Sequence, residues 1–205
     1  MDNTLLAGRT VIEIGRELGG QITILDELRA RGLTDRCRFV AEKIAGWPIA
    51  RLERIVNQLP LDCGAHRLVA SVGSRMPVVL LTDSFTQAAN VAAARVGILH
   101  VVANPLEVEN GAFTGRVLDW RIACGILSSS EVVHKGEAIH ALATKFGLSP
   151  QHFAMIGDGA NDIPAMEAAG LAIAIRPQPG VAECADLVVN DLSEAAEAIL
   201  KRKNS

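Results

Sequence analysis

The sequence contains no tyrosine, and its few phenylalanines and tryptophans make up only 3% of 205 residues. Proteins that stack single-stranded bases rely on aromatic side chains, so such a platform is not expected here. The formal net charge of −3 also gives no general attraction to nucleic acid or to an anionic membrane. We therefore expect neither of these as a partner.

Long apolar runs and paired cysteines are also missing. The longest apolar stretches, around Val78–Leu81 and Leu171–Ile175, have the length of strands and fall well short of the roughly 20 residues that span a bilayer. The acidic Asp2 and the lack of a basic flank indicate that the first residues are not a signal peptide. The four cysteines are far apart and form no CxxC pair, so we expect no zinc site and a reduced, cytoplasmic protein.

The sequence is rich in apolar residues, 49% of the total, and in glycine, which favours a compact α/β enzyme. Residues 10 to about 71 read as helices, because apolar side chains recur at helical spacing. From Met76 onward apolar runs alternate with helical segments, and residues 106–118 read as a β-hairpin around Asn110-Gly111. The predicted strands are 77–82, 98–103, 153–157, 171–175 and 187–189, and the predicted helices are 86–96, 135–146 and 192–200, the last capped by Asp191. This order predicts a Rossmann-like parallel sheet with helices on both faces, preceded by a small inserted helical cap.

The most informative polar cluster is the turn Asp158-Gly-Ala-Asn-Asp162, which directly follows an apolar strand. Ligands of such sheets bind beyond the carboxyl ends of the strands. Two carboxylates four residues apart on a flexible loop suit one hard cation, and Mg²⁺ commonly joins carboxylates to a substrate phosphate. The alternative is an ordinary strand-to-helix turn, in which Asp158 forms an Asx turn and Asp162 caps a helix. A nucleotide site is disfavoured, because the loop does not follow G-x-G-x-x-G and the chain has no Walker sequence.

Two further clusters stand at a strand end and at a helix start. The Thr82 hydroxyl and the amides of Asp83 and Ser84 are suited to donate to phosphate oxygens, and Lys135 is suited to place a positive charge beside them. The alternatives are a helix cap at Thr82–Ser84 and a solvated surface lysine at Lys135. The three clusters together define the candidate site.

Four segments occur in the order of the four haloacid dehalogenase motifs: Met1–Leu6, Val79–Ser84, Lys135–Glu137 and Ile156–Ile163. From Lys135 to Asp191 the sequence is similar to phosphoserine phosphatases almost throughout. The chain thus resembles phosphatases of the haloacid dehalogenase superfamily, and among them phosphoserine phosphatases. This resemblance implies a Rossmann-like core formed by residues 1–8 and 71–205, with residues 9–70 as a helical cap.

The resemblance also implies a two-step phosphoryl transfer, in which an aspartate accepts the phosphoryl group and water then hydrolyses the aspartyl-phosphate. Asp2 corresponds to the general acid and base, and it is also expected to be one of the metal-site residues. Asp158 corresponds to a Mg²⁺ ligand, and Asp162 to a residue that holds the metal site from behind. Lys135 corresponds to the catalytic cation. The residues expected around the phosphate are Thr82, Asp83, Ser84 and Asn161.

The first motif departs from the family pattern Asp-x-Asp-x-Thr, because the sequence begins with Met1-Asp2-Asn3-Thr4. The nucleophilic aspartate and its strand are not in the sequence as given. We expect the lack of this strand to expose apolar faces and unpaired backbone groups. Two explanations are open: an internal methionine taken as the start, which we prefer, or a catalytically silent protein that binds phosphate or metal. In both cases we expect little phosphatase turnover from the polypeptide as given.

The substrate end of the site shows a second departure. Phosphoserine phosphatases place a glutamate near the substrate amine where this sequence has Arg9, and Arg38 lies near the position of their carboxylate-binding arginine. A cation at Arg9 repels an ammonium group and favours a carboxylate or a second phosphate. The alternative for both arginines is surface charge on amphipathic helices. We therefore predict a small anionic phosphorylated metabolite, with phosphoserine not favoured over others. A homodimer over the face left by the absent strand is a further arrangement that the sequence allows.

Overall fold

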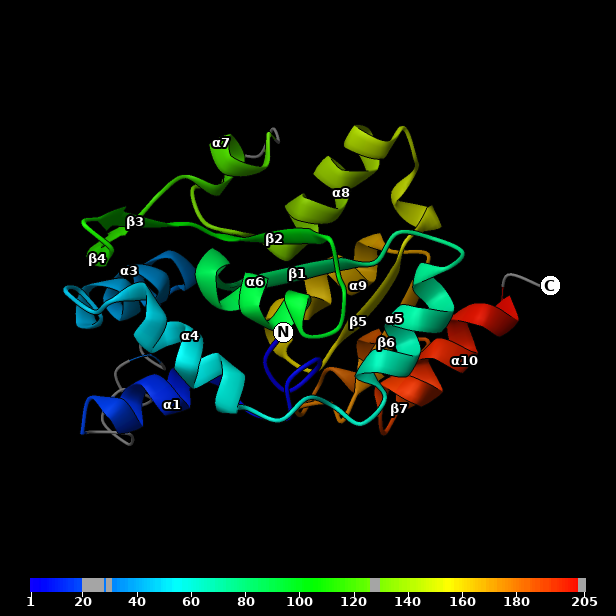
Figure 1. Ribbon diagram of the computed structural model, residues 1–205. Helices are drawn as coiled ribbons and strands as arrows, with labels where there is room; N and C mark the ends of the chain where they lie inside the picture. Colours follow the sequence, from blue (N-terminus) through cyan, green and yellow to red (C-terminus); the bar gives the residue numbers. More distant parts are fainter. Residues whose placement is uncertain (20–27, 29–30, 126–129, 203–205) are drawn as a thin grey trace.

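A computed structural model of the protein describes residues 1–19, 28, 31–125 and 130–202 (Figure 1). Its parallel strands form two separate sheets, one with the order β1-β2 and one with the order β5-β6-β7, beside an antiparallel hairpin of β3 and β4. The strands are β1 (Val79–Phe85), β2 (His100–Asn104), β3 (Leu106–Glu109), β4 (Ala112–Val117), β5 (Ala154–Gly157), β6 (Leu171–Ile175) and β7 (Leu187–Val189).

The described helices surround these strands. Helices α8 and α9 pack together, as do α5 and α10, while α4 packs on α6 and α3 on β4. Figure 1 shows α1, α3, α4 and the hairpin at one end of the molecule, with α5 and α10 at the other. These helices are α1 (Thr10–Glu17), α3 (Leu33–Lys43), α4 (Ile49–Gln58), α5 (Ala65–Gly73), α6 (Thr86–Ala94), α7 (Trp120–Cys124), α8 (Lys135–Phe146), α9 (Ile163–Ala168) and α10 (Leu192–Arg202).

Local sequence signals account for several of these boundaries. All five residues of β6 are buried and apolar, as a strand between two others requires. The β3–β4 turn places Asn110 at φ 50° and Gly111 at φ 79°, the left-handed conformation that this residue pair adopts readily in hairpins. Helix α10 begins where Asp191 accepts a hydrogen bond of 2.7 Å from the Ser193 amide, and the predicted cap is thereby confirmed.

The predicted α/β fold is confirmed, and the predicted strands and the hairpin are present with ends shifted by up to three residues. The largest shift is at β1, which continues in extended conformation through Phe85. The short helices α7 and α9 were not predicted from the sequence. A predicted helical stretch that includes Ile22, Ile24 and Leu25 lies outside the described residues. None of the helices in the described ranges is long and apolar enough to cross a membrane.

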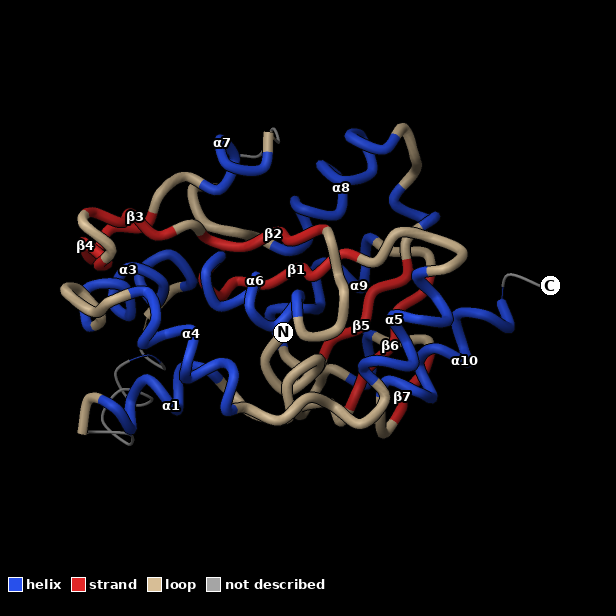
Figure 2. Tube along the Cα trace, in the orientation of Figure 1, coloured by secondary structure: helices blue, strands red, loops and turns tan. Residues whose placement is uncertain are grey.

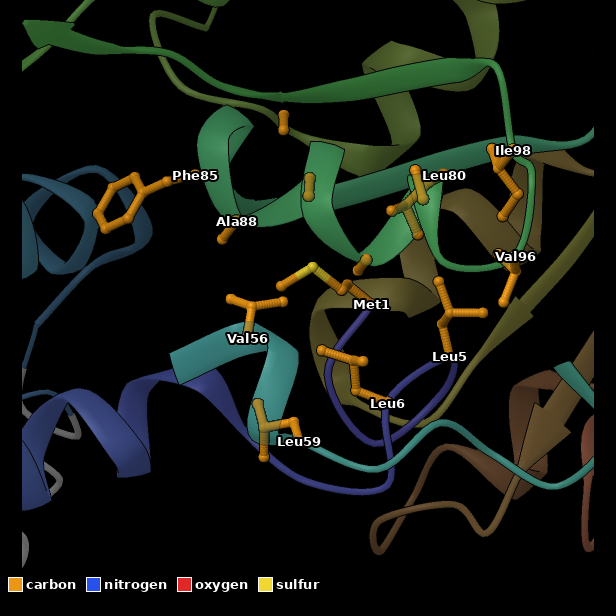
Figure 3. Packing of buried hydrophobic residues seen from close by; sticks show 14 of the residues in the cluster. Met1, Leu5, Leu6, Val56, Leu59, Leu80, Phe85, Ala88, Val96 and Ile98 are labelled. Atoms are coloured by element: carbon orange, nitrogen blue, oxygen red, sulfur yellow. The ribbon is translucent and has the colours of Figure 1, made fainter. Parts of the chain in front are cut away.

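The first residues of the chain belong to the interior. Met1, Leu5 and Leu6 have exposed fractions of 6%, 5% and 0% and join the main hydrophobic core. Figure 3 shows these side chains among those of the core, with Val56 and Leu80 nearby. The N-terminus therefore lies in the middle of the molecule, as the trace in Figure 2 also shows.

The parallel sheet, expected in one piece, is divided. A cavity of about 380 Å³ separates β1 from β5 and is bordered by Val78–Leu81 and Phe153–Ile156, with Met1 and Leu5 at one end. We call it the β1–β5 groove. Its lining is almost entirely apolar.

Candidate active site

The carboxyl ends of β1 and β5 meet the N-terminal end of α8. The Asn161 side-chain nitrogen donates to Asp83 Oδ2 over 3.0 Å, which joins the turn after β5 to the end of β1. Lys135 Nζ lies 2.6 Å from Asp162 Oδ1 and 3.9 Å from Asp83 Oδ1. The three polar clusters that were predicted to converge are therefore adjacent.

The acidic turn is closed from within by Asp162. Its Oδ2 accepts hydrogen bonds of 3.0 Å from the amides of both Asp158 and Gly159. A Cβ atom at Gly157 would lie only 2.4 Å from Asp162 Cγ, so glycine is required at that position for the turn to close. Asp162 therefore closes the turn and leaves Asp158 facing the cavity, but it makes no side-chain cap hydrogen bond to α9, so it is not the cap of that helix that the simpler interpretation expected.

Asp158 is held by the N-terminal loop and by one later residue. Thr4 Oγ1 donates to Asp158 Oδ1 over 3.1 Å, and Asn3 Nδ2 donates to Oδ2 over 3.3 Å. Gln178 Nε2, from the loop after β6, donates to the same Oδ2 over 3.2 Å. Gln178 was not predicted as a site residue, because no local motif marks a loop glutamine.

Lys135 is buried, with an exposed fraction of 6%, so the interpretation as a solvated surface lysine is wrong. Burial by itself lowers the pKa of the Lys135 ammonium, but the carboxylates of Asp83 and Asp162 more than offset this, and its pKa is raised. Burial likewise acts to raise the pKa of Asp162, and the charge and hydrogen bond of Lys135 hold it below its ordinary value. The two side chains therefore form a buried ion pair.

Asp2 has a different environment. Its Oδ1 accepts a hydrogen bond of 2.7 Å from Thr10 Oγ1, at the start of α1. Burial raises the pKa of the Asp2 carboxyl, against the opposing effects of the charged N-terminal amine and the Thr10 hydrogen bond. The pKa of the Met1 amine is itself lowered, by burial and by the nearby Lys135. A raised pKa favours the protonated carboxyl, which is the form that a general acid needs.

The end of β1 is fixed from its own strand and from β2. Thr82 Oγ1 accepts a hydrogen bond of 3.1 Å from the Ser84 amide, whereas the N-cap of α6 is Phe85, without a side-chain cap. The helix-cap interpretation of Thr82–Ser84 is therefore wrong. Asn104, fully buried at the end of β2, donates to the Asp83 carbonyl over 2.7 Å and accepts from the Val133 amide over 2.8 Å. It thereby aligns the β1 end with the segment that leads into Lys135.

A cavity of about 270 Å³ opens over these residues, a size suited to a small ligand. Of the predicted site residues, those that line it are Asp2, Arg9, Thr82, Asp83, Ser84, Lys135, Asp158 and Asn161. Asp162 lies behind Lys135. Arg38 is not part of the lining, because its Nη2 pairs with Glu131 Oε2 at 2.7 Å. Arg36, two residues earlier on α3, lines the cavity in its place.

The carboxylates suit Mg²⁺ in number and chemistry. Within residues 1–19, 28, 31–125 and 130–202, no group of three or more His, Cys, Asp or Glu side chains is arranged to hold a metal. Mg²⁺ usually needs only one or two carboxylates, since waters and substrate phosphate complete its coordination. Asp2 and Asp158 both line the cavity and present oxygen ligands, so the residues present fit this ion.

Comparison with known proteins agrees with this geometry. The sequence model of haloacid dehalogenase-like hydrolases matches residues 1–170. The chain belongs to the haloacid dehalogenase-like hydrolase family. Its fold is that of this family too: the structure superposes on a substrate-bound phosphoserine phosphatase with a TM-score of 0.77 and 26% identity, covering 98% of this chain and 94% of the other. A phospho-aspartyl intermediate analogue of a phosphoserine phosphatase gives a TM-score of 0.76 at 25% identity, covering 97% and 95%.

Several relatives of this haloacid dehalogenase-like chain are phosphoserine phosphatases. The protein from Idiomarina loihiensis is 30% identical over 196 residues, which cover 93% of this chain and 86% of the relative. The protein from Archaeoglobus fulgidus is 31% identical over 192 residues, or 91% of this chain, but the match spans only 54% of that longer protein. The predicted resemblance to phosphoserine phosphatases is confirmed, and with it the enzyme class of a phosphoric monoester hydrolase.

Proposed function

We propose that the protein is a Mg²⁺-dependent phosphatase that hydrolyses a small phosphomonoester through an aspartyl-phosphate, once an aspartate stands directly before Met1. The convergence of Lys135, Asp83, Asn161 and Asp158 at one cavity carries this proposal. It puts a buried cation beside carboxylate oxygens, the combination that neutralises a phosphoryl group in transfer.

The residues of this chain divide the work as follows. The Lys135 ammonium and the Thr82 hydroxyl bind phosphate oxygens, together with Asn161 and the backbone around Asp83 and Ser84. The Asp162 carboxylate, with Oδ1 2.6 Å from Lys135 Nζ, keeps the lysine charged and fixes its orientation. Asp158 and an oxygen of Asp2 would hold Mg²⁺, and the ion would supply further positive charge at the phosphate.

Asp2 moves the protons. In the first step an aspartate oxygen forms a bond to phosphorus, the ester P–O bond breaks, and the leaving oxygen takes the proton from the Asp2 carboxyl. In the second step a water oxygen forms a bond to the same phosphorus and gives a proton to the Asp2 carboxylate, while the bond between phosphorus and the aspartate oxygen breaks. This releases inorganic phosphate and restores both groups. The hydrogen bond from Thr10 fixes Asp2 for both steps.

The substrate is, on this proposal, an anionic phosphorylated metabolite. The relatives are named phosphoserine phosphatases, which makes phosphoserine one candidate. Arg9 and Arg36 line the cavity, and their charges favour a carboxylate or a second phosphate on the substrate over an ammonium group.

The test is phosphate release by the chain lengthened before Met1 with an apolar segment and an aspartate. We expect Mg²⁺-dependent turnover of at least one compound in a panel of phosphorylated metabolites, and none from a matched chain with asparagine in place of the aspartate. A folded aspartate form that binds Mg²⁺ and phosphate without turnover would instead support the second candidate, a silent phosphate- or metal-binding protein.

We further propose a core of residues 1–8 and 71–205 and a cap of residues 9–70, although α5 spans the second boundary while packing against α10. A cytoplasmic location, the lack of a nucleic-acid partner and a homodimer are also part of the proposal. Light scattering of the purified chain tests the last of these directly.

A further inference from the structure

Asp62 is a buried carboxylate, with an exposed fraction of 5%, that takes no part in the proposed reaction. Its Oδ1 accepts hydrogen bonds of 3.0 Å from the amides of Gly64, just before α5, and Leu192, at the start of α10. A Cβ atom at Gly64 would lie only 2.1 Å from the Ser193 nitrogen, so the two helix ends are in close contact. The backbone of two helices therefore fixes Asp62 in place.

The second oxygen of Asp62 binds Arg176, which follows β6. Arg176 Nη1 lies 2.8 Å from Asp62 Oδ2 and also donates to the Asn190 carbonyl. Its Nη2 donates over 3.0 Å to the carbonyl of Asn3, 173 positions earlier in the sequence. The Asp62 amide donates to the Leu5 carbonyl over 2.9 Å. Because a guanidinium group is planar and rigid, a carboxylate on one nitrogen also fixes where the other nitrogen points. Together the two residues hold residues 2–6, which we call the 2–6 loop.

The backbone of Arg176 is strained. Its φ of 41° lies in the left-handed region, which glycine and asparagine adopt far more readily than arginine does. Strain of this kind persists only where the surrounding contacts fix it, and it is commonest at functional sites. The turn by itself would be served better by glycine, so the contacts of the guanidinium group account for an arginine at this position.

The loop that Arg176 holds is also the loop that supports the expected metal site. Asn3 Nδ2 donates to Asp158 Oδ2 over 3.3 Å, and Thr4 Oγ1 donates to Asp158 Oδ1 over 3.1 Å. Asp2, the other expected metal-site residue, directly precedes Asn3 in the chain. A displacement of the Asn3 backbone would therefore disturb both residues.

We propose that Arg176 and Asp62 are positioning residues for the Mg²⁺ site. Asp62 orients the Arg176 guanidinium group, which holds the 2–6 loop and, through it, the carboxylate of Asp158. Neither Arg176 nor Asp62 lines the active-site cavity, so both act through the loop and not on the substrate. The effect on the metal rests on the proposed function, whereas the ordering of the loop does not.

The experiment compares the chain as given with Arg176→Gly, Asp62→Asn, the double variant and a control. Arg176→Gly removes the guanidinium group and suits the left-handed backbone, so it adds no strain. Asp62→Asn keeps an oxygen for the two helix-end amides and removes the charge that orients Arg176. The control is Arg67→Gln, because Arg67 Nη2 and Glu197 Oε1, 3.0 Å apart, form an exposed ion pair between the same helices, α5 and α10.

Mg²⁺ affinity is measured by calorimetry, and loop order by amide hydrogen exchange. We expect the Mg²⁺ dissociation constant to rise roughly tenfold in Arg176→Gly and by a smaller factor in Asp62→Asn. The double variant should bind Mg²⁺ as Arg176→Gly does, because Asp62 acts through Arg176. The amides of Leu5 and Leu6, which donate to the Met1 carbonyl, should exchange at least roughly threefold faster in Arg176→Gly. The control should match the wild type in both measurements.

The outcomes separate a positioning role from a purely structural one. If Arg176→Gly lowers the melting temperature but leaves Mg²⁺ affinity and loop exchange unchanged, Arg176 serves only the fold and the proposal is wrong. Additive losses of affinity in the double variant would overturn the link between Asp62 and Arg176. If the wild type binds no Mg²⁺, the proposed function fails, and faster exchange of the 2–6 loop in Arg176→Gly would still support its positioning by Arg176.

Discussion

Replacing Lys135 with methionine should lower the free energy of unfolding by about 3–5 kcal/mol, the usual cost of removing one partner of a buried ion pair. The side chains of Lys135 and Asp162 are only 6% and 5% exposed, with Nζ and Oδ1 2.6 Å apart. Methionine keeps the apolar stem, so the loss comes mainly from the charge. The Asp162 carboxylate keeps its two backbone donors, but it is left in a low-dielectric interior without a cation.

The pH dependence gives this prediction its sign. Lys135 holds the pKa of Asp162 below its ordinary value, against the effect of burial. The ion pair therefore stabilises the fold fully above the unfolded-state pKa of about 4, and this stabilisation is lost as the pH falls through the lowered pKa of the folded state. In Lys135→Met, the opposing charge of the lysine is gone, so burial of Asp162, now opposed mainly by its backbone hydrogen bonds, favours its protonated form more than in the wild type. The difference in stability between the two proteins should therefore be largest near neutral pH and shrink below about pH 4.

The assay is urea unfolding of the wild type and of Lys135→Met, near neutral pH and below about pH 4, with Lys201→Met as the matched control. Lys201 is 80% exposed on α10, so its replacement should change the free energy of unfolding by no more than about 0.5 kcal/mol. If Lys135→Met unfolds at the wild-type urea midpoint, or if its loss is the same at both pH values, the buried pair does not have the role given to it here.

Four other predictions concern the site. Asp158→Asn should weaken Mg²⁺ binding, measured by calorimetry, by at least the roughly tenfold that follows loss of a supporting partner of a metal ligand; unchanged affinity would exclude Asp158 as a ligand. In the lengthened aspartate form, Arg9→Glu should shift kcat/KM by about tenfold toward phosphoserine relative to a phosphomonoester with an anionic tail, as one charge contact of about 1.4 kcal/mol would; an unchanged ratio would remove Arg9 from substrate selection. In the same lengthened aspartate form, Thr10→Val removes a hydrogen bond that lowers the pKa of Asp2. The pH above which kcat falls should therefore move to a higher value, and an unchanged value would count against Asp2 as the general acid. Burial raises the pKa of the Cys37 thiol to about 12. Iodoacetamide at about pH 8 should therefore label the exposed Cys63 and spare Cys37 until the protein unfolds. Equal labelling rates would show that Cys37 is accessible.

Much of the fold could be predicted because local signals were strong. The five apolar residues of β6, the Asn110-Gly111 turn and the cap at Asp191 each act within a few residues of chain. The helix α7 has only five residues, Trp120–Cys124, too few to produce a helical periodicity. It depends instead on a cap from Asp119 and on the left-handed Gly125.

The site was predictable as a set of strand ends, but not in its pairings. Lys135 and Asp162 are 27 positions apart, and nothing in either segment indicates that they form a buried pair. The two arginines of α3 show that sequence alignment alone does not fix which side chain faces the cavity. Arg36 and Arg38 are two residues apart, a rotation of about 200° on a helix, so a two-residue uncertainty in alignment moved the prediction from the cavity to the Glu131 side.

The most direct test of the central claim is a crystal structure of the lengthened asparagine form grown with Mg²⁺ and inorganic phosphate. We expect an ion bound to Asp158 and a phosphate within hydrogen-bonding distance of Lys135 Nζ and Thr82 Oγ1. If both species are absent from this cavity, and Asp158 keeps only its bonds to Asn3, Thr4 and Gln178, the claim that this turn assembles a phosphoryl-transfer site is contradicted.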